Sequence, residues 1–195
     1  GQKLEAEKQN SIMLKQQFEN TFFQLLQMHH DIVKSIHWNE KIGREVFLHR
    51  YINFKNKLLK DCQAVYDKDG ELIRINVDRL LNRDITNETY LIFYNDFISD
   101  ASLYFRELYR IVKFVDEHQI LSSEEKYEYV AILRSQLSDY ERVWMFYNCC
   151  SSNGVEKFKP LIEKYALMHN FPEDILVWED HRKFYEPGAF ERVMA

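Results

Sequence analysis

The chain has 195 residues, of which 46% are hydrophobic and 15% aromatic, so it is long enough for one domain with a substantial core. It contains only 5 glycines and 3 prolines, which disfavours an all-β fold and favours long helices. The formal net charge of -5 disfavours non-specific binding to nucleic acid, because such binding depends on an excess of Lys and Arg.

The chain begins with a predicted long helix whose first part is poor in large apolar side chains. Residues 2–17 are good helix formers, which predicts an exposed helical stalk. From Phe18 onward apolar residues recur at helical spacing, so the helix is expected to enter the core there. We therefore predict an exposed stalk over residues 1–17 and a single helical domain over residues 18–195.

Two further expectations concern this stalk. An alternative to burial is a short coiled-coil seam that joins copies of the chain into a homo-oligomer. The residues of that seam would be Leu14, Phe18, Phe22 and Leu25. The chain also opens on Gly1 rather than Met and enters helical sequence directly, which predicts that another segment precedes it in the full-length protein.

The next predicted helix starts after Gly43 and ends near Tyr66. Between Lys41 and Lys60 six cations stand against Glu45 alone, which makes this the most basic local face. A strong turn over residues 67–70 follows. Residues 71–86 are ambiguous, because part of the segment alternates like a strand and part suits a helix. We expect an irregular segment or a short helix there.

Three more helices are predicted in the second half of the chain. The first runs from Asn87 to His118. The second starts at a Ser122 or Ser123 cap and ends at Gly154, which is expected to be left-handed. Within it, residues 132–148 are apolar almost all round, so this segment is expected to be the central helix. The third follows over residues 155–168.

The C-terminal residues 170–195 are rich in aromatic side chains without a sustained period, so short turns that wrap the helices are expected there. The predicted fold is therefore all-α: a bundle of about five main helices with a long N-terminal stalk-like helix and an irregular aromatic C-terminal tail. The three cysteines, Cys62, Cys149 and Cys150, form no disulfide framework or paired zinc motif and are expected to be buried thiols.

Arg44 and His49 are the candidate catalytic residues. They match the loose R-x(4–6)-H pattern of the HEPN ribonucleases, in which Arg and His assist attack by the ribose 2′-hydroxyl without a metal. A chain of this composition supplies about one such match by chance. We therefore favour a surface Arg and a partly packed His on a basic helix, and keep the ribonuclease as the alternative.

Polar residues within the predicted central helix are the candidate binding residues. They are Arg134, Gln136, Ser138 and Asn148. Because buried polar groups need hydrogen-bond partners, we expect these side chains to hold neighbouring helices in register rather than to line a ligand pocket. By contrast, Asp139, Glu141, Glu125 and Glu128 are expected to lie on an exposed face.

The sequence predicts no metal site and no cofactor. His29 and His30 are adjacent, so on a helix they point about 100° apart and cannot bind one ion as a same-face pair would. A Gly-rich phosphate loop, a G-x-S-x-G motif and an HExxH motif are all absent from the sequence. We therefore favour a protein that is not an enzyme.

Several stretches, in their order and spacing, carry a resemblance to a known family. They are FENTFFQLLQMHHDIV from Phe18, GREVF from Gly43, SLYFRELYRIVKFVDE from Ser102, ILRSQLSDYERVWMFYN from Ile132 and KFKPLIEKYALMHNF from Lys157. Together they resemble the phage abortive-infection proteins, the AbiC-like family of bacteria. The resemblance spans residues 18–171.

This resemblance implies a role in antiphage defence, in which infection is sensed and the infected cell is stopped. Such proteins commonly carry two membrane helices ahead of a charged stalk, which implies a domain in the bacterial cytoplasm at the inner face of the cell membrane. A phage or host protein is then the expected partner. Under the ribonuclease alternative, the partner is RNA. The family offers no established catalytic residues to transfer.

Overall fold

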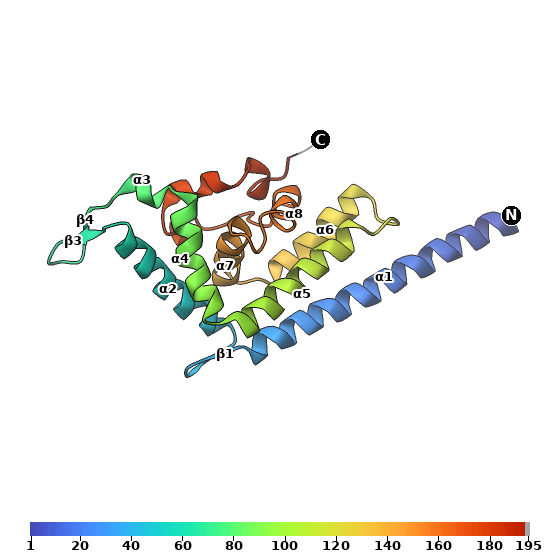
Figure 1. Cartoon of the computed structure of the whole chain (residues 1–195). Helices are drawn as coiled ribbons and strands as arrows, with labels where there is room; N and C mark the ends of the chain where they lie inside the picture. The colour runs from blue at the N-terminus through green and yellow to red at the C-terminus, as the bar shows by residue number, and fades with distance from the viewer. Residues whose placement is uncertain (194–195) are drawn as a thin grey trace.

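The computed structural model describes residues 1–193 and confirms the predicted all-α fold (Figure 1). Helices hold most of these residues, and their strands are limited to two short antiparallel hairpins. No helix in the described part of the chain is both long and apolar enough to cross a membrane.

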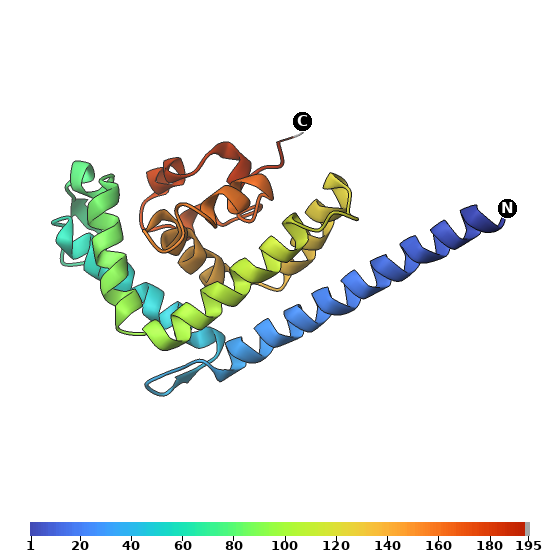
Figure 2. The ribbon, with the colours of Figure 1, turned by 45° about the vertical axis from the view of Figure 1, so that its right-hand side comes forward.

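Helix α1 runs from Gln2 to Ser35, and its two halves differ in burial. Residues 1–17 are all exposed, whereas burial begins at Phe18 and then recurs every third or fourth residue. The first half of α1 projects past the rest of the chain in both ribbon views (Figures 1 and 2). The expected exposure and core entry are therefore observed, and the division into a stalk and a single domain stays a prediction.

The alternative coiled-coil seam is wrong. Phe18 and Phe22 are at most 1% exposed and pack on Tyr129 of the same chain, while Leu25 is also buried in this core. Three of the four predicted seam residues are therefore not available to a second copy. A homo-oligomer through the more exposed first half of α1 stays a prediction.

Helix α2 runs from Arg44 to Asp61 and follows a hairpin of strands β1 (His37–Trp38) and β2 (Lys41–Ile42). Its end lies earlier than predicted, because Val65–Tyr66 forms strand β3. This strand pairs with β4 (Leu72–Arg74) around the predicted turn over residues 67–70. The alternation in the ambiguous segment was thus a strand signal, and a short helix α3 (Val77–Leu80) follows it.

The predicted helix from Asn87 to His118 is wrong as a single piece. The structure has helix α4 from Arg83 to Asn95 and helix α5 from Ile98 to Asp116. Helix α4 begins earlier than predicted because the side chain of Asn82 accepts hydrogen bonds from the first free amides of the helix.

A buried arginine holds the break between α4 and α5. Arg50 of α2 is 1% exposed and donates to the Asp96 carboxylate at 2.6 Å and to the Phe93 carbonyl. The rings of Trp38 and Phe97 lie about 5 Å from its guanidinium, at 4.9 and 5.2 Å. A cation at the C-terminal end of a helix interacts favourably with the helix dipole, so Arg50 stabilises the end of α4.

The predicted central helix is also wrong as one continuous helix. It is divided into α6 (Ser123–Ser135) and α7 (Asp139–Cys150), which begin with reciprocal capping boxes. Ser122 and Glu125 form the first box, and Ser138 and Glu141 form the second. The second box stops the chain from continuing α6 and starts a new helix in another direction.

Helix α7 has the predicted central position, since every residue from Glu141 to Cys149 is buried. It ends at Cys150, and Gly154 is not in the predicted left-handed conformation. Instead, a Cβ atom at Gly154 would come within 2.9 Å of the Cys149 sulfur, so close packing requires glycine there. Cys62 and Cys149 are buried thiols, as predicted, whereas Cys150 is half-buried.

The long helices form two groups. Helices α1, α5 and α6 lie side by side, with α1 and α5 running in opposite directions (Figures 1 and 2). Helices α2, α4 and α7 pack against one another in the second group. The side chain of Trp144 in α7 donates to the Phe47 carbonyl of α2 at 2.9 Å, which fixes the two helices in register.

The predicted irregular aromatic tail is confirmed over residues 170–193, where it packs against α7, while residues 194–195 lie outside the described part of the chain. The expected helix over residues 155–168 is shorter, because regular α-helix α8 is limited to Lys159–Lys164. Short 3₁₀ helices follow at Glu173–Ile175, Glu179–Phe184 and Pro187–Ala189. His181 and Tyr185 from this segment bond to Tyr147 and to the Phe146 carbonyl of α7.

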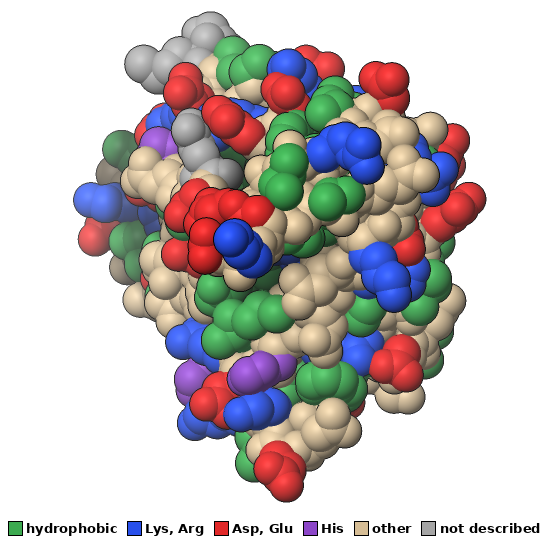
Figure 3. Space-filling view, turned by 90° about the vertical axis from the view of Figure 1, so that its left-hand side faces the viewer, with side chains coloured by type: hydrophobic (Ala, Val, Ile, Leu, Met, Phe, Trp, Pro, Cys, Tyr) green, Lys and Arg blue, Asp and Glu red, His purple; other side chains and the backbone are tan. Residues whose placement is uncertain are grey.

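The fold pairs three of the six cations of the predicted basic face with carboxylates. Arg50 is buried against Asp96, Arg44 contacts Glu141, and Lys57 contacts Asp61. On the side of the molecule drawn in Figure 3, acidic, basic and hydrophobic side chains are interspersed. The structure therefore offers less basic surface than the local sequence suggests.

Candidate functional site between helices α1 and α7

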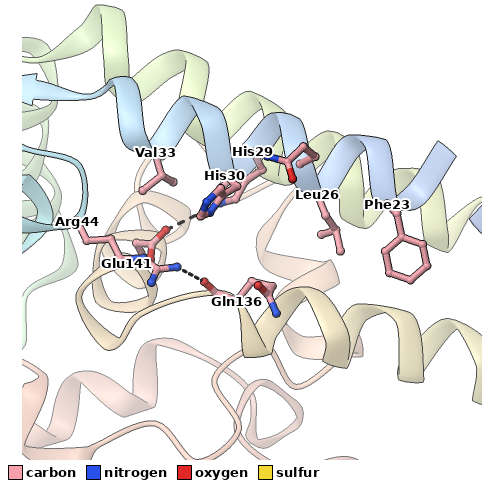
Figure 4. A pocket seen from close by; sticks show the side chains of 9 residues that line it. Phe23, Leu26, His29, His30, Val33, Arg44, Gln136 and Glu141 are labelled. Carbon is pink, nitrogen blue, oxygen red and sulfur yellow. Dashed lines mark hydrogen bonds and ion pairs between the residues drawn. The ribbon is translucent and has the colours of Figure 1, made fainter. Parts of the chain in front are cut away.

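A half-open pocket of about 370 Å³ lies where α1 passes over α2 and the start of α7 (Figure 4). Its lining comes from three separate parts of the chain. The lining residues are Phe23, Leu26, Gln27, His29, His30, Val33, Arg44, Gln136 and Glu141. Because α1 forms one wall and the bundle forms the other, anything bound there contacts both.

His29 is the most unusual side chain in this pocket. It lies on the buried face of α1 and is 4% exposed, yet neither ring nitrogen has a hydrogen-bond partner in the described structure. Its Nε2 atom is 3.9 Å from Glu141 Oε1, which is too long for a hydrogen bond. A buried polar group without a partner costs free energy, so a polar group that reached this imidazole would relieve that cost.

The imidazole of His29 is neutral near pH 7. Burial lowers its pKa to about 4, and the positive charge of Arg44 acts in the same direction. A neutral imidazole has one donor and one acceptor nitrogen. His29 can therefore bond a polar ligand from two sides without introducing a charge.

Glu141 is the buried acidic group of the site, and the capping box of α7 positions it. Its Oε2 atom accepts from the Ser138 amide at 2.8 Å and lies 3.2 Å from Arg44 Nε, while Oε1 accepts from the Tyr104 hydroxyl at 3.0 Å. Burial and the neighbouring carboxylate keep the pKa of Tyr104 well above its ordinary value, so Tyr104 remains a donor. The prediction that Glu141 lies on an exposed face is wrong.

Arg44 joins α2 to the loop between α6 and α7. Besides its contact with Glu141, it donates from Nη2 to the Gln136 carbonyl at 2.7 Å. Its side chain remains 54% exposed, so part of the guanidinium faces the pocket opening. The site thus combines a paired Arg and Glu with a free neutral imidazole. Within residues 1–193, no group of three or more His, Cys, Asp or Glu side chains could hold a metal ion.

The structure does not bring the two candidate catalytic residues into one pocket. Arg44 lines the pocket described above, whereas His49 is half-buried and does not line that pocket. On one helix, residues five positions apart point about 140° away from each other. Whether either residue acts in catalysis stays a prediction.

The four candidate binding residues have different surroundings. Arg134 donates to the Ala166 carbonyl at 3.0 Å, and Ser138 caps α7. Asn148 is 2% exposed and accepts from the Tyr90 hydroxyl of α4 at 2.9 Å. Arg134 and Asn148 link separate elements as expected, whereas the hydrogen bonds of Ser138 lie within the start of α7. Gln136 is exposed, so the expectation that it is buried among helices is wrong, and it lines the pocket instead.

Sequence analysis missed His29, Glu141 and Tyr104 as members of one site. A signal was present for Glu141, because Ser138 followed three residues later by Glu is the pattern of a capping box. The spacing of His29 from Phe18, Phe22 and Leu25 also placed it on the buried face of α1. That these side chains meet depends on how α1, α5 and α7 cross, which local patterns do not contain.

A family model described as putative phage abortive infection protein matches residues 96–175. It confirms the predicted resemblance to this family over these residues, while the resembling stretches before residue 96 lie outside the match. The matched segment contains α5, α6, α7 and α8, and it includes Gln136 and Glu141 of the pocket and Tyr104, which bonds to Glu141. The match supports a role in phage abortive infection for this chain. Neither the curated proteins nor the solved structures include a significant match.

Proposed function

We propose that this chain is the cytosolic sensor domain of a membrane-anchored bacterial antiphage protein, and that it recognises a phage or host protein. The pocket between α1 and α7 is the observation that carries the proposal. A protein partner that inserts a polar side chain would bond His29 and the exposed part of Arg44. Residues 96–175, which match the family model, contribute Gln136 and Glu141 to one wall of the pocket, and α1 forms the other wall. Such binding would therefore alter how α1 packs.

Helix α1 is suited to relay that change. Its first half is exposed, and Lys15 in that half pairs with Glu125 of α6 at 2.7 Å. Beyond it, Phe18 and Phe22 pack on the ring of Tyr129 in α6, whose hydroxyl donates to Glu19 at 2.5 Å. Exposed ion pairs contribute little to stability, so the part of α1 before Phe18 can shift at a small energetic cost. In the proposal, a shift of α1 moves a membrane anchor that precedes it in the full-length protein.

The alternative is a HEPN-like ribonuclease toxin that acts on RNA. It requires Arg44 and His49 to work together on one phosphate. The pairing of Arg44 with Glu141 and the separation of the two residues around α2 favour the sensor proposal.

A phage-challenge assay with the full-length protein tests both ideas. Gln27→Trp fills the pocket from an exposed position, and Asn20→Trp adds the same bulk two turns earlier on the same face of α1, outside the pocket. The sensor proposal expects Gln27→Trp to abolish plaque reduction and Asn20→Trp to preserve it. It also expects protection to survive His49→Ala.

Two outcomes contradict the sensor proposal. If His49→Ala abolishes protection while the protein stays folded by circular dichroism, the ribonuclease alternative gains the support. If Gln27→Trp protects as well as the unchanged protein, the pocket does not sense infection. Membrane fractionation of the full-length protein tests the anchor separately, and its recovery in the soluble fraction would remove that part.

A further inference from the structure

A second pocket, of about 260 Å³, lies between α4, α5 and the turn that follows α7. It shares no residue with the pocket beside α1. The lining residues are Tyr94, Ser102, Phe105, Arg106, Tyr109, Asn148, Asn153, Lys157 and Phe158. Most of them belong to the segment that matches the abortive infection family.

The charge of this pocket is opposite to that of the whole chain. Arg106 and Lys157 are its charged lining residues, and no carboxylate lines it, although the chain carries a formal charge of -5. Both side chains are exposed, and neither makes a hydrogen bond or ion pair within residues 1–193. Two cations without anionic partners beside a cavity attract an anion, and phosphate suits Arg through two parallel hydrogen bonds.

The walls of the pocket are aromatic. Tyr109 and Phe158 meet edge to face with their ring centres 5.6 Å apart, and Tyr94 is half-buried on the other side. The pKa of Tyr94 is raised by burial, and the positive charge of Arg106 partly offsets that rise. Arg106 is therefore close enough to interact electrostatically with the Tyr94 hydroxyl. Aromatic side chains next to cations offer stacking surface for a flat ring that is attached to an anionic group.

A buried amide completes the pocket. Asn148 is 2% exposed, and its Oδ1 atom accepts from Tyr90 at 2.9 Å and from Asn153 at 3.4 Å. Its Nδ2 atom has only the Cys149 sulfur, 4.0 Å away, which is a weak partner. A buried amide donor with so poor a partner beside a cavity can recognise a polar ring edge.

We infer that this pocket binds a small nucleoside phosphate. Arg106 and Lys157 hold the phosphate, the aromatic walls contact the base, and Asn148 donates to its edge. The volume of about 260 Å³ lies just below the range of roughly 300–1,000 Å³ typical of small-molecule sites, so the ligand is no larger than a single nucleotide. The inference rests on residues that the proposed sensing pocket does not use, so either one can fail while the other stands.

The test is calorimetric titration of the purified chain with AMP, GMP, CMP and UMP, and with inorganic phosphate and the matching nucleosides. At least one nucleotide is expected to bind at least about tenfold more tightly than phosphate or its nucleoside. Arg106→Gln and Lys157→Gln should each weaken that binding at least about tenfold, because each removes a charged hydrogen bond.

Arg110→Gln is the matched control. Arg110 lies one turn further along α5, is 60% exposed and pairs with Glu107 outside the pocket, so its loss should leave binding unchanged. The inference is overturned if no mononucleotide binds at millimolar concentration, or if Arg106→Gln and Arg110→Gln have equal effects. Phosphate that binds as tightly as every nucleotide also overturns it. So does an RNA oligonucleotide that binds through Arg106 while mononucleotides do not.

Discussion

Helices α6 and α7 begin with the same local motif but lie in opposite environments. In α6, Ser122 and Glu125 form a capping box at the surface, and Glu125 pairs with Lys15 of α1. In α7, Ser138 and Glu141 form the same box, but Glu141 is fully buried. The motif therefore determines where each helix begins, whereas burial determines how much each glutamate contributes.

The partners of the two glutamates explain this difference. Glu125 has a lysine partner that is about half exposed, and water screens such pairs. Glu141 satisfies a buried phenol, a backbone amide and Arg44 at once. Removing a group of this kind leaves its buried partners without hydrogen bonds, which costs more than the loss of a surface contact.

The largest expected effect is the difference in stability lost when each of the two glutamates is replaced by alanine. Glu141→Ala is expected to lower the free energy of unfolding by about 3 kcal/mol, because the Tyr104 hydroxyl stays buried without its acceptor. Glu125→Ala, the matched control, should have a much smaller effect. Urea denaturation followed by circular dichroism measures both, and equal losses would show that burial is not what separates the two capping boxes.

The second largest effect is expected in the pH dependence of stability, and it comes from His29, which lies beside Glu141 of α7. The pKa of His29 is about 4 in the folded chain and near 6.5 when it is unfolded, so below pH 6.5 the unfolded state binds more protons. Stability should therefore fall as the pH falls. The loss between pH 7 and pH 5 should be about 2 kcal/mol from this group.

His29→Leu tests that assignment because it removes the titrating ring and keeps an apolar side chain. The other charged or titratable groups beside His29 are His30, Arg44, Tyr104 and Glu141, and they remain in the variant. Urea denaturation at pH 7 and pH 5 should show a smaller decrease for the variant than for the unchanged chain. Identical decreases would assign the acid sensitivity to another group.

The smallest effect on stability is expected from the surface pair of Glu125 in α6 with Lys15. The hydrogen bond from Lys15 and the Ser122 amide lower the pKa of Glu125 to about 2, so its contribution is present above the unfolded value of 4.5 and is lost as the pH falls toward 2. Lys15→Gln should reduce stability slightly at low salt, and the reduction should vanish at high salt. A reduction that persists in 1 M salt would contradict the assignment to a screened surface pair.

The candidate site was less predictable than the fold. Helical spacing from Phe18 correctly indicated where α1 enters the core, and the Ser122 cap correctly placed the start of α6. The same kind of cap at Ser138 lay inside a continuous apolar pattern, so the pattern concealed the break. His29 and Glu141 are 112 positions apart, and no local rule predicts that they meet.

Local sequence patterns were enough to predict the all-α fold, the exposed first half of α1, the irregular aromatic C-terminal tail and the family resemblance. These features depend on local periodicity, helix propensity and the order of short motifs. Three features became visible only in the tertiary structure: the break between α4 and α5 at Arg50, the burial of Glu141, and the lack of a hydrogen-bond partner for the His29 ring. Each depends on contacts between distant segments, where packing decides which polar groups lose water and which find a partner.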